Sequence, residues 1–195
     1  MTKISFSRLR VILIDRDGVI NHEPGPILNP DQFVMIPGSA DAVAKINAKG
    51  WKCFVITNQA AIARGDLSKD VFEQITNKMI LELNKSGAQI DGQYFCPHHP
   101  DWKNGKRRKN PVSCLCRKPG IRLLEQASSE HGFVPEEAVF IGDTTTDFAA
   151  ASAWGTFSIG VRTGWAGEDG KMLAFPDYWS DDLKSAVDFL LHNTA

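Results

Sequence analysis

Short runs of consecutive apolar residues recur along the chain and alternate with longer segments of mixed character. The run at 11–14 and the run at 53–56 contain only apolar side chains, as is typical of strands that are buried on both faces. Such strands belong to parallel sheets, because crossover helices cover both faces of those sheets. The pattern predicts strands at 11–14, 53–56, 94–95, 139–141 and 156–160.

The segments between these runs have the helical period, with apolar residues every three or four positions. After Ser68, for example, Phe72, Ile75, Met79 and Leu83 fall on one face. The predicted helices are 39–49, with Ser39 as N-cap and Gly50 as stop, then 68–86, 121–131, 147–153 and 180–191. The polar, basic segment 102–113 is predicted to be a loop. Alternating strands and helices predict an α/β fold, a parallel sheet with helices on both faces.

Length, charge and composition narrow the class of protein. The chain has 195 residues and a formal net charge of −1, which predicts a single domain over residues 1–195. A nearly neutral chain argues against a nucleic-acid or membrane-surface binder, so we expect neither partner. No apolar run approaches the roughly 20 residues of a membrane span, and the N-terminal segment is too polar for a secretory signal. We therefore expect a cytoplasmic protein.

Polar clusters follow three of the predicted strands directly, at 15–18, 57–59 and 142–147. Asp and Thr at such positions are often turn residues or helix caps, and one cluster alone would indicate no more than that. The carboxyl ends of parallel strands, however, meet at one edge of the sheet, where ligands bind. Three clusters in these positions favour a functional site.

The chemistry of these clusters indicates a divalent cation and a phosphorylated substrate. Asp15 and Asp17 lie two residues apart, and Asp143 comes from a different strand. Gathered carboxylates repel one another, which a hard cation such as Mg²⁺ relieves, and Mg²⁺ favours phosphate-bearing partners. Arg117 and Lys118, just before the predicted helix at 121–131, can add positive charge to the same pocket. No dinucleotide-binding or P-loop motif occurs.

A second set of metal-binding residue types lies in the segment 96–116. Cys96, His98, Cys114 and Cys116 offer three thiolates and one imidazole, the composition of a closed structural zinc site. His99 is an alternative ligand one position further on. The remaining cysteine, Cys53, falls within a predicted strand and is expected to be inert core.

The strand-end motifs resemble those of the haloacid dehalogenase superfamily of phosphatases. The matching segments are 15–21, 57–59, 117–119 and Gly142-Asp143-x-x-x-Asp147, which together span nearly the whole chain. The resemblance implies a Rossmann-like fold and a phosphorylated aspartate. It makes Asp15 the nucleophile and Asp17 the acid and base. It also implies Mg²⁺ on Asp15, the Asp17 carbonyl and Asp143, with Thr57 and Lys118 on the phosphoryl oxygens. For Asp147, a metal contact and a role in capping its helix or orienting Lys118 both remain open.

The cysteine segments resemble the zinc loop shared by heptose-bisphosphate and histidinol-phosphate phosphatases, in which the first histidine is the ligand, here His98. The segments 61–65 and 161–164 are similar to the heptose enzymes. This implies removal of one phosphate from D-glycero-D-manno-heptose 1,7-bisphosphate. Thr144, Ala60 and Ala61 depart from the residues usual in those enzymes, at positions that concern the grip on the substrate.

The expected partner is a small sugar phosphate bound by a monomer. Asn58, Gln59 and Arg64 join Arg117 as expected substrate contacts. The intervals between the motifs are too short for a separate cap domain, so an open site is expected. Two alternatives are a histidinol-phosphate phosphatase and, in a different class, a nucleic-acid-binding module built on the basic zinc loop.

Overall fold

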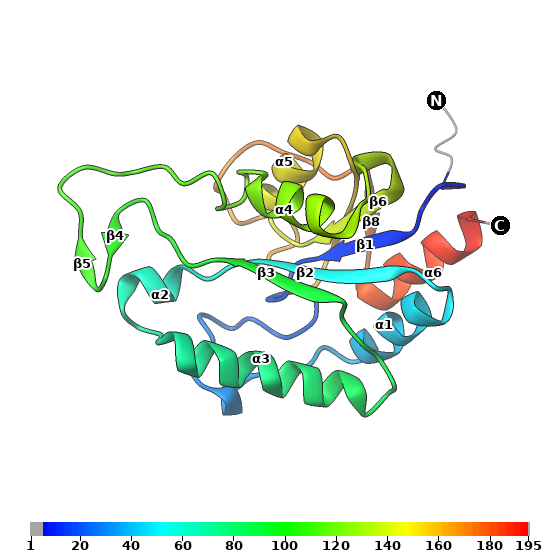
Figure 1. Cartoon of the computed structure of the whole chain (residues 1–195), viewed down its shortest axis with the longest axis horizontal. Coiled ribbons are helices and arrows are strands. Elements are labelled where there is room, and N and C mark those ends of the chain that lie inside the picture. The colour runs from blue at the N-terminus through cyan, green and yellow to red at the C-terminus, as the bar shows by residue number, and fades with distance from the viewer. Residues whose placement is uncertain (1–5, 195) are drawn as a thin grey trace.

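Strand β1 (Val11–Ile14) lies in the middle of the sheet and is buried along its whole length. The computed structural model describes residues 6–194, and within them six strands pair in parallel in the order β3-β2-β1-β6-β7-β8 (Figure 1). The other strands are β2 (Lys52–Asn58), β3 (Gly92–Cys96), β6 (Ala138–Gly142), β7 (Phe157–Val161) and β8 (Tyr178–Ser180). The predicted parallel α/β sheet is confirmed.

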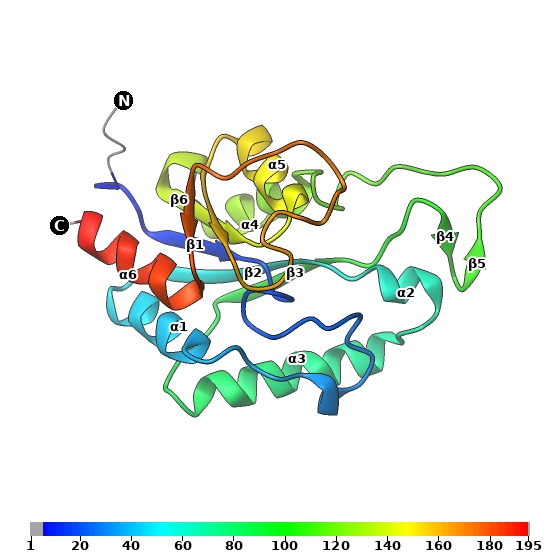
Figure 2. The same ribbon diagram turned by 180° about the vertical axis from the view of Figure 1, so that it is seen from behind.

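Alternate residues of β1 face two separate apolar layers. Ile12 and Ile14 pack in one core and Val11 and Leu13 in the other. Figures 1 and 2 show α1, α3 and α6 on one face of the sheet and α4 and α5 on the opposite face. The helices are α1 (Ser39–Ala48), α2 (Ala60–Arg64), α3 (Lys69–Asn84), α4 (Arg122–His131), α5 (Thr145–Trp154) and α6 (Leu183–Asn193). Helices therefore cover both faces, as the sequence predicts.

The start of α1 differs from its prediction by one residue. Gly38, not Ser39, is the N-cap, and its backbone adopts the left-handed conformation with φ 85°. The hydroxyl of Ser39 instead donates a hydrogen bond to the Val19 carbonyl at 3.2 Å. Ser39 thus ties the helix to the first motif, 15–21, and the free amides of the first turn receive no side-chain cap.

The C-terminal segment departs further from its prediction. The predicted helix at 180–191 begins only at Leu183, after Asp182, whose carboxylate accepts a hydrogen bond from the Ser185 amide at 2.7 Å. Ser180 itself ends strand β8, which adds a sixth strand beside β7. A strand of three residues has no room for a periodic pattern, and for that reason the sequence does not reveal it.

The connections leave the carboxyl edge of the sheet open. Between β1 and β2 the chain forms only the 3₁₀ turn Pro30–Gln32 and α1. The predicted loop at 102–113 contains a small hairpin, β4 (Trp102–Lys103) and β5 (Lys106–Arg107), which projects beyond the sheet (Figure 1). Within residues 6–194 there is accordingly no separate cap domain. None of the described helices is long and apolar enough to cross a membrane.

Candidate active site at the carboxyl edge of the sheet

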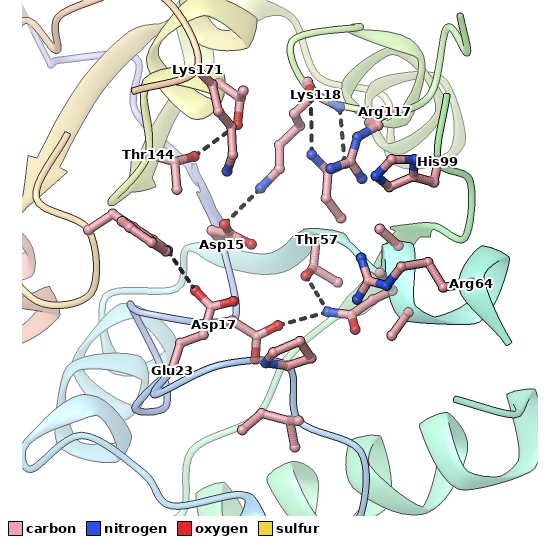
Figure 3. A pocket seen from close by; sticks show the side chains of 18 residues that line it. Asp15, Asp17, Glu23, Thr57, Arg64, His99, Arg117, Lys118, Thr144 and Lys171 are labelled. Atoms are coloured by element: carbon pink, nitrogen blue, oxygen red, sulfur yellow. Dashed lines mark hydrogen bonds and ion pairs between the residues drawn. The ribbon is translucent and has the colours of Figure 1, made fainter. Parts of the chain in front are cut away.

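The ends of β1, β2 and β6 bring the three polar clusters to one pocket. Ile14 is in register with Val55 on one side and Ile141 on the other, so Asp15 emerges beside the last residues of β2 and the end of β6. A cavity of about 330 Å³ opens there. Its lining includes these predicted site residues: Asp15, Asp17, Thr57, Asn58, Gln59, Arg64, Arg117 and Lys118 (Figure 3).

Three buried carboxylates form the acidic floor of the site. Asp15, Asp143 and Asp147 each offer an oxygen atom, and these atoms lie within 4.8 Å of one another. One oxygen of Asp143, Oδ2, accepts a hydrogen bond from the Trp165 amide at 2.7 Å, whereas its Oδ1 is buried and has no hydrogen-bond partner in the described structure. An acceptor in that position needs a proton or a cation.

Two glycines allow the chain to close around Asp143. Gly18 and Gly164 both have positive φ, 81° and 67°, and a Cβ atom at either position would overlap the Asp143 carboxylate. Only glycine fits such a close approach in this conformation. The first motif and the loop after β7 are therefore both shaped around this side chain.

The burial of these acids sets their protonation. Burial, with the charges of Asp147 and Asp17, raises the pKa of Asp15 to about 7 although Lys118 opposes the shift. Burial and the neighbouring charges of Asp147 and Asp15 also raise the pKa of Asp143 well above its usual range. A hard divalent cation with oxygen ligands fits this site, because it would neutralise the gathered charge and coordinate the unpartnered Asp143 oxygen.

Lys118 is the buried cation that faces this acidic floor. Its ammonium Nζ lies 3.0 Å from Asp15 Oδ2 and 2.6 Å from Asp147 Oδ1, and it donates a hydrogen bond to the Ile56 carbonyl at 2.8 Å. Burial works against its charge, but the carboxylates of Asp147 and Asp15 outweigh burial and raise the pKa of Lys118. The ammonium is consequently charged and held in place.

Asp147 has both of the structural roles weighed from sequence. Its Oδ2 accepts hydrogen bonds from the backbone amide and the hydroxyl of Thr144, at 3.0 and 2.6 Å, and so caps helix α5. Its Oδ1 orients Lys118. Asp147 thus joins the acidic floor as the residue that positions the lysine.

The Asp17 carboxylate points to a different set of partners from the acidic floor. It forms a bidentate pair with Arg16, at 3.0 and 2.7 Å, and accepts hydrogen bonds from Asn21 at 3.0 Å and Gln59 at 2.8 Å. Burial raises its pKa, but Arg16 and these donors outweigh burial, and the net effect lowers the pKa of Asp17. The fully buried Arg16 is a positioning residue that the sequence reasoning did not single out.

The predicted substrate contacts differ in how free they are. The side-chain amide of Asn58 binds the backbone of Lys118. It accepts a hydrogen bond from the Lys118 N–H at 3.0 Å and donates one to the Lys118 carbonyl at 3.2 Å. Gln59 links Asp17 to Thr57, whose hydroxyl it reaches at 2.9 Å. The Arg64 guanidinium lies 2.8 Å from the carboxylate of Asp66 on one side and lines the pocket on the other.

The cysteine cluster gathers four potential metal ligands beside the pocket. One ligand atom each from Cys96, His98, Cys114 and Cys116 lies within 4.8 Å of the others. The distances among these four ligand atoms run from 2.8 to 3.7 Å, at or below the edge of about 3.8 Å in a tetrahedron with bonds of about 2.3 Å. The donor set fits zinc. Cys53 is fully buried in β2, as expected of a core cysteine.

His99 belongs to the pocket and not to this cluster. It lines the cavity, and its Nδ1 accepts a hydrogen bond from the Asp101 amide at 3.1 Å. Arg117 follows the cluster directly and also lines the cavity, with one guanidinium nitrogen 3.4 Å from the His98 carbonyl. The metal-binding loop and the pocket are therefore continuous along the chain.

The pocket also contains residues that the sequence reasoning missed as site residues. Glu23 follows the first motif, whereas Trp165 and Lys171 come from the connection between β7 and β8. The β7–β8 connection carries no periodic or motif signal beyond residue 164.

An aspartate pair after the first strand, a threonine near the end of the second, and a buried lysine facing an aspartate on a parallel α/β sheet define a hydrolase of the haloacid dehalogenase type. A HAD-hydrolase-like family model matches residues 115–186. A solved D,D-heptose 1,7-bisphosphate phosphatase from B. bronchiseptica, in complex with magnesium and phosphate, superposes with a TM-score of 0.83 at 27% identity, covering 94% of this chain and 99% of that one.

Curated relatives narrow the class. The D-glycero-beta-D-manno-heptose-1,7-bisphosphate 7-phosphatase of Pasteurella multocida is 38% identical over 72% of this chain and 74% of its own length. The D-glycero-D-manno-heptose-1,7-bisphosphate 7-phosphatase of Thermosynechococcus vestitus is 32% identical over 94% of this chain and 96% of its own length. The chain belongs to the heptose-1,7-bisphosphate 7-phosphatase family of HAD-like hydrolases.

The raised pKa values of Asp15 and Asp143 predict how magnesium and pH act on stability. Their folded pKa values lie above the unfolded value of about 3.9, so these two groups bind more protons in the metal-free fold than in the unfolded chain, and their contribution to stability falls as pH rises toward 7. Mg²⁺ competes with these protons. The rise in melting temperature on adding Mg²⁺ should therefore be larger at pH 7.5 than at pH 5.5, and Asp143→Asn should abolish it. An equal rise at both pH values would contradict this assignment.

The cysteine cluster predicts about one zinc per chain. Cys116→Ser should lose the metal, lower the melting temperature and reduce activity, because Arg117 and Lys118 follow the cluster directly. The matched control is Cys53→Ala, which removes a thiol from the core and should leave the zinc content unchanged. Elemental analysis and thermal unfolding measure both effects. Full stability and activity in a zinc-free preparation would rule out a structural metal.

Proposed function

We propose that this chain is a Mg²⁺-dependent phosphomonoesterase that removes the 7-phosphate from D-glycero-D-manno-heptose 1,7-bisphosphate. The observation that carries the proposal is the position of Asp15. Its carboxylate lies at the open end of β1, in a pocket lined by Asp17 and Thr57, with the Lys118 ammonium 3.0 Å away. The names of the relatives support the heptose substrate over histidinol phosphate and over a nucleic-acid module.

Asp15 would act as the nucleophile. Its ionised oxygen attacks the phosphorus, the bond from phosphorus to the sugar oxygen breaks, and the phosphoryl group is held as an aspartyl phosphate. Lys118 favours the ionised form of Asp15 and, with the hydroxyl of Thr57, binds the phosphoryl oxygens. Asp15, Asp143 and the Asp17 carbonyl would hold Mg²⁺, which when bound supplies further neutralisation of phosphoryl charge.

Asp17 would supply the proton chemistry. It protonates the leaving sugar oxygen in the first step and then takes a proton from the water that hydrolyses the aspartyl phosphate. Its lowered pKa suits the second step, in which it is the base. The approach of a phosphate dianion raises a carboxyl pKa by like-charge repulsion, which supplies the protonated form needed first.

The non-reacting phosphate would bind on the cationic side of the pocket. Arg64 and Arg117 both line the cavity, and Figure 3 shows them on the same side of Asp15, together with His99. Two phosphates need more cationic partners than one, and a planar guanidinium grips a phosphate with two parallel hydrogen bonds. We also propose that the chain is a monomer with a single domain, and that zinc holds the loop at 96–116.

The proposal predicts phosphate release from the heptose bisphosphate in the presence of Mg²⁺, stopping at the monophosphate. Asp15→Asn should abolish turnover, because an amide is a poor nucleophile and the charge of a metal ligand is lost. Phosphate release measured across a panel of sugar phosphates and histidinol phosphate tests the substrate. A higher kcat/KM for histidinol phosphate, or more than a few per cent activity in Asp15→Asn, would refute the assignment.

Arg117→Ala should raise KM for the bisphosphate by about tenfold or more, the worth of a hydrogen bond to a charged group. The KM for p-nitrophenyl phosphate, which has no second phosphate, should change by about twofold at most. Arg122→Ala is the matched control, because Arg122 is exposed at the start of α4 and does not line the cavity. Equal effects of Arg117→Ala on both substrates would contradict its role.

A further inference from the structure

One wall of the pocket is built by the connection between β7 and β8, and the proposed mechanism leaves it without a role. Trp165 and Lys171 from this connection line the cavity together with Glu23. Figure 3 shows Lys171 above Asp15 and Glu23 below it, whereas Arg64 and His99 lie to the right. The pocket therefore has a second polar side, distinct from the arginine side.

This wall is fixed to the acidic floor at several points. The Asp143 carboxylate accepts a hydrogen bond from the Trp165 amide at 2.7 Å, and the Asp143 backbone carbonyl accepts one from the Gly167 amide, also at 2.7 Å. The side chain of Asp169 is buried, and its Oδ1 accepts a hydrogen bond from the Thr145 amide at 2.9 Å, at the first turn of α5. Its Oδ2 lies 3.2 Å from the Lys171 ammonium. Lys171 and Trp165 are thus placed before any substrate arrives.

Three functional groups of the wall remain able to meet a ligand. The Trp165 indole N–H donates to Glu23 Oε2 at 3.2 Å, which orients that carboxyl group, while Trp165 as a whole residue is 50% exposed. The Lys171 side chain is 48% exposed, and its ammonium has three donors, more than its one ion pair with Asp169 requires. Burial and the charge of Asp17 raise the pKa of Glu23 to about 7, against which Trp165 and Lys171 favour the ionised form.

A carboxylate, an ammonium and an exposed indole that line the same pocket are suited to a polyol. The carboxylate accepts hydrogen bonds from hydroxyl groups and the ammonium donates them. The apolar face of the indole covers the C–H groups between those hydroxyls. A second phosphate fits this wall less well, since the carboxylate of Glu23 would repel it.

We propose that Trp165 and Lys171, acting with Glu23, form the surface that recognises the hydroxyl-bearing carbon chain of the substrate and thereby determine specificity for the sugar. This rests on the proposed function, because it assigns the sugar to one wall and the second phosphate to the arginines. Lys171 would contact a hydroxyl directly. Trp165 would be both a contact and the residue that positions Glu23.

The test compares the heptose bisphosphate with p-nitrophenyl phosphate, which has no polyol. Lys171→Met should lower kcat/KM for the sugar bisphosphate by about tenfold, the worth of a hydrogen bond to a charged group, and Lys171→Arg should restore most of it. Trp165→Phe keeps an aromatic ring but removes the N–H, and it should also lower kcat/KM for the sugar bisphosphate. For p-nitrophenyl phosphate, all three variants should stay within about twofold of the unsubstituted chain.

The matched control is Lys49→Met. Lys49 is exposed at the end of α1, before β2 begins and therefore at the opposite edge of the sheet, so its loss should change neither substrate. If the unsubstituted chain shows no preference for any sugar phosphate over p-nitrophenyl phosphate, the proposed function has failed. If the preference exists and both Lys171→Met and Trp165→Phe retain it, or lose both substrates equally, the assignment of the wall is overturned while the phosphatase stands.

Discussion

Repulsion among the buried carboxylates at the ends of β1 and β6 is the constraint to which the surrounding chain responds. Asp15, Asp143 and Asp147 are held within 4.8 Å of one another, where like charges in a poorly solvated site strongly oppose ionisation. Lys118 neutralises two of them directly, at 3.0 and 2.6 Å. The third, Asp143, keeps one oxygen without a hydrogen-bond partner among residues 6–194. A site with one carboxylate left unbalanced is prepared for a cation and, with it, for the negative charge of a phosphoryl group.

The cysteine loop is connected to this charge balance through Lys118. The neutralising lysine does not lie on a sheet strand but two residues after Cys116, between the cluster and α4. Its placement depends on Asn58, which holds its backbone on both sides, and on the order of the loop that precedes it. A segment with little apolar content needs cross-links or a metal to become ordered. The charge balance of the site therefore depends on an ordered loop, because the loop leads directly to Lys118.

The site was predictable from sequence where it depends on sheet topology. Buried strands identify themselves as apolar runs, and the rule that ligands meet the carboxyl edge then places Asp15, Thr57 and Asp143 together. The residues that escaped prediction have no such pattern. Arg16 reads as a charged residue of a turn, yet it is fully buried against Asp17. The Trp165 wall follows a strand end by way of an irregular connection, whose course depends on tertiary hydrogen bonds to Asp143 rather than on local periodicity.

An open site places a particular demand on these irregular segments. Within residues 6–194 no cap domain covers the pocket, so selectivity must come from loops that surround it. Loops keep precise positions only when they are bonded to rigid elements. Here the connection between β7 and β8 is bonded to Asp143 and to helix α5. Asp143 holds the Trp165 amide, and Asp169 joins Lys171 to the first turn of α5. Trp165 is thereby tied directly to the Asp143 carboxylate, and Lys171 is tied to the helix that follows it, so the proposed recognition of the substrate would depend on the charge state of the acidic floor.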